Sequence, residues 1–178
     1  MQGPDRTIQD VLEAEGATVS EELSRVLAWA EEEARKHRRH SLTREMFLIA
    51  MLSDSDCWGL QIFQRAFHRR KEDPSEPSLL SDLRKYFTLH EAPDDGDLPL
   101  SPEEIPLTPR AERALREALQ YARDRGDSTL DSRHLMFVMH RDPDGFKWYD
   151  RFSGKRPRLT TSVDLEVVFD SLFVVSGD

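Results

Sequence analysis

A stretch of 34 residues near the start of the chain recurs 88 positions later without a gap, because residues 19–52 align with residues 107–140. Seven of the aligned pairs are identical, whereas ordinary amino-acid usage gives roughly two such matches by chance. The identical pairs are Arg25/Arg113, Leu27/Leu115, Ala30/Ala118, Ala34/Ala122, Arg35/Arg123, Leu42/Leu130 and Met51/Met139. An internal duplication of this kind favours two copies of a small unit that pack on each other over one large domain.

Each copy carries the pattern of an amphipathic helix. Apolar residues recur at steps of three and four along residues 23–34 and again along residues 111–122. Ser20 and Thr108 stand where these helices begin and can cap them, and Gly126 is suited to end the second. A further helix follows Thr43 in the first copy and Asp131 in the second. We therefore predict an all-α fold with almost no β-structure outside the last dozen residues, which suit a strand as well as a helix.

The duplication divides the chain into four segments. Residues 1–18 form an N-terminal appendage with a short helix at 7–15, and residues 19–89 form the first repeat. Residues 90–106 are a linker rich in proline and acids, which cannot bury enough surface to order itself. Residues 107–178 form the second repeat, and the two repeats make one domain. Weaker third helices are predicted at 59–67 and 146–152, and fourth helices at 79–87 and 163–173.

Composition limits the partners of the chain. A formal charge of −9 and a pI of 5.2 argue against non-specific binding to nucleic acid or to an anionic membrane, both of which need positive potential. No secretory leader and no apolar run of transmembrane length are found, and the single Cys57 fits a reducing compartment, so we expect a cytoplasmic location. Residues 35–40 are a concentrated basic run that could dock an acidic partner or pair with the acidic linker of the same chain.

The two copies resemble the amino-terminal domain of the Clp protein unfoldases, also called the Clp N or Clp R domain. The motif that carries the resemblance is LTPRAERAL, then YARDRGDSTLDSRHLM, within residues 107–136. The first copy is more diverged, with TREMF at 43–47 where the family usually has a Glu-His-Leu sequence. The resemblance covers residues 19–173 and implies a tandem, pseudo-twofold pair of four-helix repeats, most similar to the ClpC branch.

The resemblance also implies a recognition module. Family members use this domain to receive an adaptor, a degron or a modified substrate before an ATPase ring unfolds it. The ATPase is missing from this sequence, which lacks a GxxxxGK[ST] phosphate loop. We expect a protein or peptide as partner, and a Clp ATPase is a further candidate. The alternative is a free-standing regulator that sequesters adaptors or modified proteins without an unfoldase.

Some relatives in the ClpC branch bind phosphorylated arginine, and their pattern can be compared with this sequence. In them a hydroxyl at the first helix start meets the phosphate, and a Glu before the family His meets the guanidinium. Ser20 and Glu45 match this pattern in the first copy, and Thr108 and Arg133 stand there in the second. Arg133 has the wrong charge, so we expect at most one such site, in the first copy. Capping alone also explains both hydroxyls.

Val19 and Leu107 precede the two caps, where the family often carries Phe in an apolar contact surface. They could rim a groove between the copies, or act only as hydrophobic staples. His134 is expected to be a packed, hydrogen-bonded residue. We expect no metal, no cofactor and no enzyme activity, because no acid or thiolate stands at ligand spacing from His37 and His40 and no catalytic set is apparent.

Overall fold

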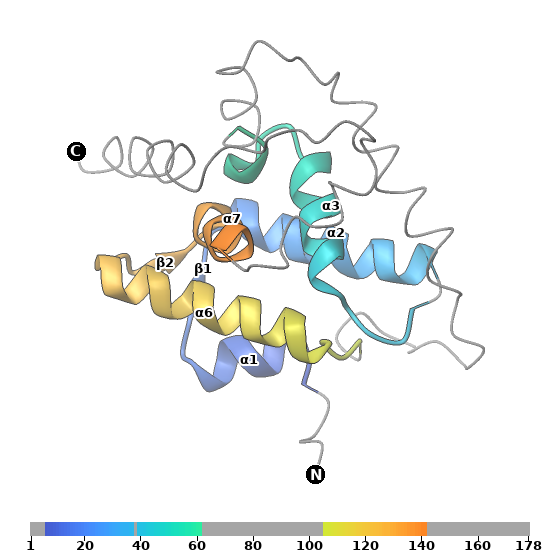
Figure 1. Cartoon of the computed structure of the whole chain (residues 1–178), viewed down its shortest axis with the longest axis horizontal. Helices are drawn as coiled ribbons and strands as arrows, with labels where there is room; N and C mark the ends of the chain where they lie inside the picture. The colour runs from blue at the N-terminus through green and yellow to red at the C-terminus, as the bar shows by residue number, and fades with distance from the viewer. Residues whose placement is uncertain (1–5, 38, 62–104, 142–178) are drawn as a thin grey trace.

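The computed structural model describes residues 6–37, 39–61 and 105–141, and in these ranges the chain is mainly helical (Figure 1). Its elements are α1 (Ile8–Ala14), β1 (Thr18–Val19), α2 (Glu21–Lys36), α3 (Arg44–Ser53), α6 (Pro109–Arg125), β2 (Thr129–Leu130) and α7 (Ser132–Arg141). Residues 58–61 are also helical, which is the start of the predicted third helix. The rest of that helix, the other predicted third and fourth helices, and the linker up to residue 104 lie outside the described residues.

The two copies form equivalent helical hairpins, α2 with α3 and α6 with α7. The helix starts are 88 positions apart in both cases, Glu21 with Pro109 and Arg44 with Ser132. This spacing equals the offset of the sequence repeat, so the predicted duplication of a hairpin is confirmed.

Both long helices begin, and α6 ends, where the sequence indicated. The Ser20 hydroxyl accepts a hydrogen bond from the Leu23 N–H at 3.2 Å, and the Thr108 hydroxyl accepts one from the Ala111 N–H at 3.3 Å. Each cap satisfies an N–H group that has no partner within its helix. Gly126 ends α6 in the left-handed region with φ +82°, a conformation that costs glycine little.

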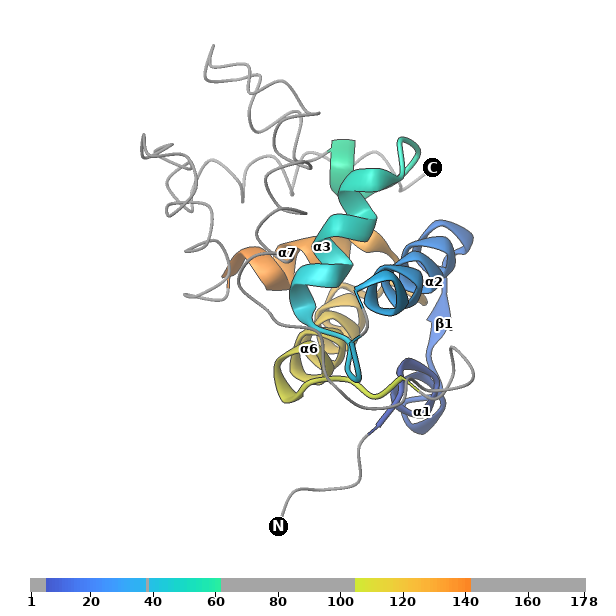
Figure 2. The ribbon, with the colours of Figure 1, turned by 90° about the vertical axis from the view of Figure 1, so that its right-hand side faces the viewer.

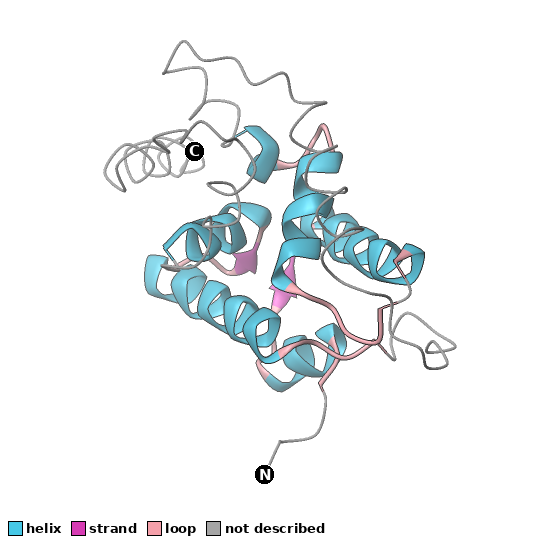
Figure 3. Ribbon diagram, turned by 45° about the vertical axis from the view of Figure 1, so that its right-hand side comes forward, coloured by secondary structure: helices cyan, strands magenta, loops and turns pink. Residues whose placement is uncertain are grey.

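Two short strands, which the sequence analysis did not predict, join the copies to each other. β1 and β2 pair in parallel, with Thr18 opposite Thr129 and Val19 opposite Leu130. Figure 3 shows them at the centre of the molecule, between the helices. Strands of two residues are too short to produce an alternating pattern in the sequence. They are too short to change the fold class, which is all-α.

The contact equivalent to the β1–β2 pair is a parallel bridge between Leu42 and Leu107. Leu107 is the repeat partner of Val19, and Leu42 is the repeat partner of Leu130. The start of each copy therefore pairs with the inter-helix turn of the other copy. This is the pseudo-twofold relation expected of the domain.

The core lies between the two hairpins. Leu27 and Leu115 are 5% and 0% exposed, and Leu42 and Leu130 are 0% and 2% exposed. These paired positions of the repeat thus face the interior, as predicted, and their burial contributes about 1.5–3 kcal/mol each.

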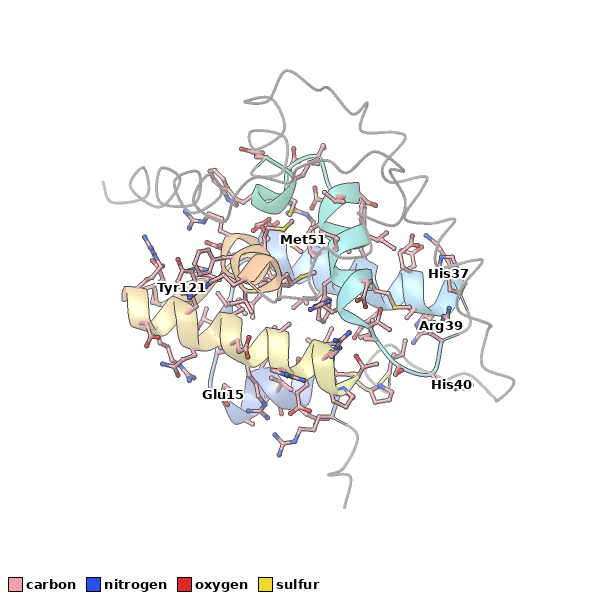
Figure 4. All side chains as sticks on the ribbon, in the orientation of Figure 1. Glu15, His37, Arg39, His40, Met51 and Tyr121 are labelled. Carbon is pink, nitrogen blue, oxygen red and sulfur yellow. The ribbon has the colours of Figure 1, made fainter. Side chains whose placement is uncertain are left out.

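The segment before the repeat packs against the second copy. Figures 1 and 2 show α1 beside α6. Val11 is fully buried, and the Glu15 carboxylate lies 2.6 Å from Nη1 of Arg116 and 2.9 Å from Nη1 of Arg123 (Figure 4). Because β1 connects α1 to α2, α1 also lies next to the start of the first copy. Within the described ranges no helix is long and apolar enough to cross a bilayer.

Candidate binding site

The two copies meet at two equivalent junctions, which hold all six predicted binding residues. The Ser20 junction comprises Val19, Ser20 and Glu22 facing residues 130–133, and the Ser20 N–H donates to the Leu130 carbonyl at 2.9 Å. The Thr108 junction comprises Leu107 and Thr108 facing residues 42–45, and the Thr108 N–H donates to the Leu42 carbonyl at 2.8 Å. The junctions share a backbone geometry and differ in their side chains.

Glu22 ties the Ser20 junction together. Its carboxylate accepts hydrogen bonds from the Ser132 N–H at 2.9 Å, from the Ser132 hydroxyl at 3.0 Å and from the Trp58 N–H at 3.3 Å. The Ser132 hydroxyl accepts in turn from the Gly59 N–H at 3.1 Å. One carboxylate from α2 therefore caps α7 and the helix that starts at residue 58, at amino termini where negative charge is favoured.

Arg133 is held inside the same junction and is only 8% exposed. Its Nε and Nη2 atoms lie 3.0 and 2.5 Å from Oδ2 of Asp131. Its guanidinium stacks over the ring of Trp58, with the carbon 5.4 Å from the ring centroid. Burial alone would raise the pKa of Asp131, but hydrogen bonds from His134 and Arg133, and their charges, lower it to about 2. The charge of Arg133 is thus paired internally.

His134 is fully buried, as predicted for a packed, hydrogen-bonded residue. Its Nδ1 lies 3.1 Å from both the backbone nitrogen and Oδ1 of Asp131, and its Nε2 lies 3.0 Å from Oδ2 of Asp127. Burial acts to lower the pKa of His134, but the hydrogen bonds and charges of Asp131 and then Asp127 outweigh it and raise the pKa. The ring joins the turn before α7 to the helix itself.

The Thr108 junction carries different chemistry at the equivalent positions. Arg110 and Arg44 stand where the Ser20 junction has Glu22 and Ser132, and Glu45 stands where it has Arg133. Arg44 is 2% exposed and its Nη2 lies 3.5 Å from Oε1 of Glu45. Thr43 begins α3 without a side-chain capping bond. The repeat is therefore symmetric in backbone and asymmetric in charge.

The backbone pairing between the copies changes which of the residues predicted to bind phosphoarginine lie together. The sequence analysis paired Ser20 with Glu45 and Thr108 with Arg133, each pair within one copy. In the structure Ser20 bonds to the residue three positions before Arg133, and Thr108 bonds to the residue three positions before Glu45. Glu45 is thus grouped with Thr108, because the backbone pairing crosses between copies. The sequence alone does not show that the start of each copy pairs with the other copy.

Val19 and Leu107 also differ from each other. Leu107 is 5% exposed, and its N–H donates to the Arg6 carbonyl at 2.7 Å, so the N-terminal segment covers it. Val19 is half-buried and lines a groove of about 450 Å³ between α1 and α2. The groove has an apolar floor that includes Ile8, Leu12, Ala17, Val19, Leu27 and Ala28, and a polar rim of Gln9, Glu13, Ser24 and Glu31.

Sequence analysis missed this groove because α1 lies outside the repeat that drew attention to Val19. The available signal was the apolar spacing of Ile8, Val11 and Leu12, which predicts a helix but does not say where it packs. A second groove of about 420 Å³ lies between α6 and α7. There Tyr121 and Phe137 stack on each other at 4.1 Å, between charged side chains that include Arg113 and Asp124.

The described residues show no cluster of three or more His, Cys, Asp or Glu side chains that could hold a metal ion. Cys57 is fully buried, and this burial raises the pKa of its thiol to about 12, although a hydrogen bond with Ser132 opposes the shift. A thiol in this state is a poor nucleophile at neutral pH. The described residues offer two surface grooves, one between α1 and α2 and one between α6 and α7.

Comparison with known proteins identifies the family of the chain. The family model of the Clp repeat (R) N-terminal domain matches residues 18–147. No curated protein is similar enough in sequence to match.

Two solved structures share the fold at low sequence identity. One comes from a study of the coevolution of the ATPase ClpV, the TssB–TssC sheath and the accessory HsiE protein in type VI secretion. It has a TM-score of 0.64 and 13% identity, covering 93% of this chain and 92% of that one. The other is the N-terminal domain of the caseinolytic protease associated chaperone ClpD from Arabidopsis thaliana. It has a TM-score of 0.57 and 10% identity, covering 87% of this chain and 94% of that one.

Proposed function

Since the chain belongs to the Clp repeat (R) N-terminal domain family, we propose that it is a protein- or peptide-binding module that receives an adaptor, a degron or a modified substrate. The observation that carries the proposal is the groove between α1 and α2. A groove with an apolar floor and a polar rim is the usual form of a surface that takes up an amphipathic segment.

The shape and chemistry of the groove support a helical or extended peptide as its ligand. Leu12 and Val19 are partly buried and pack against the core while lining the groove, so they offer apolar surface without disturbing the fold. Glu13 and Glu31 on the rim favour a ligand with basic residues beside its apolar ones. The groove between α6 and α7 is the weaker candidate because its two rings already stack on each other.

The sequence analysis leaves two forms of this function open. In the first, the module serves a Clp ATPase; in the second, it is a free-standing regulator that sequesters adaptors or modified proteins. Both use the same groove. The length of the native open reading frame separates them, since continuation into an ATPase motif supports the first form and a stop after residue 178 supports the second.

A substitution in the groove tests the function. Ala28 is exposed and lines the groove, so Ala28→Arg places a long charged side chain in it without touching the core. Peptides are first selected for binding to the wild-type domain from a random library, and their affinities are measured by fluorescence anisotropy. We expect Ala28→Arg to weaken binding at least tenfold, which is about 1.4 kcal/mol.

Ala14→Arg is the matched control, because Ala14 is exposed on α1 and does not line the groove. It should leave the affinity of the same peptides within twofold of wild type. Equal affinities of all three proteins would refute the groove as the binding site.

A second candidate ligand is phosphoarginine, now at the Thr108 junction. The supporting observation is the hydrogen bond from Thr108 to Leu42, which brings the first turns of α3 and α6 together. The amino terminus of α6 would meet the phosphate, and Glu45 would meet the guanidinium. Calorimetric titration with a phosphoarginine peptide should give one site, lost in Thr108→Ala and in Glu45→Ala and retained in Ser20→Ala. A site lost in Ser20→Ala instead would restore the pairing within one copy.

A further inference from the structure

The N-terminal segment is bound by a surface of the second copy. The Arg6 carbonyl accepts the Leu107 N–H at 2.7 Å, so residue 6 joins the backbone pairing at the start of that copy. Arg6 Nη1 lies 3.8 Å from Oε1 of Glu112, and Nη1 of Arg116 lies 2.6 Å from Oε1 of Glu15. The segment therefore runs along α6 in the same direction as that helix, as Figures 2 and 4 show for α1 and for Glu15.

The residues of the second copy that bind this segment have counterparts in the first copy. Corresponding helices of the two copies start 88 positions apart, so residues at this offset occupy equivalent places in the two hairpins. All three counterparts line the groove between α1 and α2. The groove is thus the pseudo-twofold equivalent of the surface on which α1 lies. The equivalent pairs are Leu107 with Val19, Glu112 with Ser24, and Arg116 with Ala28.

The backbone of Val19 faces the groove side of β1 in the same way as that of Leu107 faces Arg6. The Ser20 N–H donates to the Leu130 carbonyl in β2, and neighbouring N–H groups of a strand point to opposite sides, so the Val19 N–H points away from β2. Among the residues that the structure describes, none accepts a hydrogen bond from it. A strand edge of this kind is a template for pairing with a further peptide segment.

The two equivalent surfaces differ in charge. The second copy holds the N-terminal segment with an acid and a base, whereas the first copy has Ser24 and Ala28 at these positions. On α2 the Glu15 carboxylate would therefore face Ala28 and lose its ion pair. This difference favours α6 over α2 as the position of α1, and it favours a less charged segment for the groove.

We propose that the groove binds its peptide in the way that α6 binds residues 6–15. A carbonyl of the peptide accepts the Val19 N–H, and a short capped helix follows it along α2, in the same direction. The occupant is a segment of another protein with apolar residues at positions i and i+3, like the buried Ile8 and Val11 of α1, and with uncharged residues at both ends. The proposal rests on the function proposed for the groove and adds the binding mode and the class of ligand.

The test converts the α2 surface into a copy of the α6 surface. The probe is a fluorescent synthetic peptide of residues 5–16, and the protein is the full chain. Ser24→Glu with Ala28→Arg supplies the acid and the base that pair with this sequence on α6. Fluorescence anisotropy should show that the probe binds the double variant at least tenfold more tightly than wild type. Loss of folding cannot produce such a gain.

Ser24→Arg with Ala28→Glu is the matched control, because it adds the same two charges in exchanged positions. It should bind the probe no more tightly than wild type does. Equal gains in both double variants, or no gain in either, would overturn the proposed binding mode. The function itself fails separately, when Ala28→Arg does not weaken the binding of peptides selected against wild type.

Hydrogen exchange at one amide tests the backbone pairing. In the free protein the Val19 N–H should exchange faster than the Leu107 N–H, which is bonded to Arg6. Saturation with a peptide selected for binding to wild type should slow exchange at Val19 at least tenfold and leave Leu107 unchanged. Shifted methyl signals at Leu12 and Leu27 without slower exchange at Val19 would place the peptide in the groove but refute the backbone bond.

Discussion

Glu22 illustrates how single side chains give the two junctions their different character. It lies in the first turn of α2, where a negative charge interacts favourably with the helix dipole. In the structure it also caps the start of α7 and the helix that begins at residue 58. The repeat partner of Glu22 is Arg110, so this contact cannot occur at the Thr108 junction. The sequence shows the difference in charge, but only the fold shows which helix end each residue reaches.

Replacing Glu22 by Ala should therefore destabilise the protein by about 1–3 kcal/mol, because the buried N–H and hydroxyl of Ser132 lose their acceptor. Glu21→Ala is the control, since Glu21 is adjacent, its side chain is 94% exposed, and its ion pair with Arg25 spans 3.9 Å. The control removes the same charge from the same helix turn and should cost less than about 0.5 kcal/mol. Urea unfolding measures both, and equal losses would mean that Glu22 acts only through the helix dipole.

His134 should make stability depend on pH. Its pKa is raised in the folded protein, so its contribution is fully present below the unfolded value of 6.5 and is lost as pH rises through the folded value. Wild type should thus lose stability as the pH rises above 6.5 relative to His134→Gln, in which this titration is absent. Urea unfolding at several pH values gives the two slopes. Parallel slopes would show that Asp127 and Asp131 do not favour the protonated ring.

At the level of elements, the sequence predicted the long helices well and the contacts between copies poorly. α2 and α6 carry apolar residues at helical spacing and a hydroxyl cap, and both begin at the expected residue. β1 and β2 carry no such signal, because pairing of two residues depends on what the fold brings together. The same holds for α1, whose helical pattern was visible while its packing on α6 was not.

The duplicated hairpin makes paired substitutions informative. Leu115→Ala should cost about 2–5 kcal/mol, since Leu115 is fully buried and the change leaves a cavity in the core. Leu27→Ala, at the equivalent position and 5% exposed, should cost a similar amount. Denaturant titration measures both. A loss below about 0.5 kcal/mol for either would mean that the apolar face of its helix does not pack against the core.

At the level of the whole molecule, duplication predicted the domain but not its binding surface. The six residues expected to bind do lie at two related junctions, yet Arg133 and Leu107 are buried there and Val19 lines a groove with α1. The groove could not be predicted from the repeat, because it needs a helix that the repeat does not contain.

The central claim is that the groove between α1 and α2 receives a peptide, and methyl nuclear magnetic resonance tests it most directly. The domain is labelled at Ile, Leu and Val methyl groups and titrated with a peptide selected for binding. We predict that the methyl signals of Leu12, Val19 and Leu27 shift, because these residues line the groove, while that of Val138 between α6 and α7 does not. Shifts at Val138 with none at Leu12 and Val19 would contradict the claim and move the binding site to the other groove.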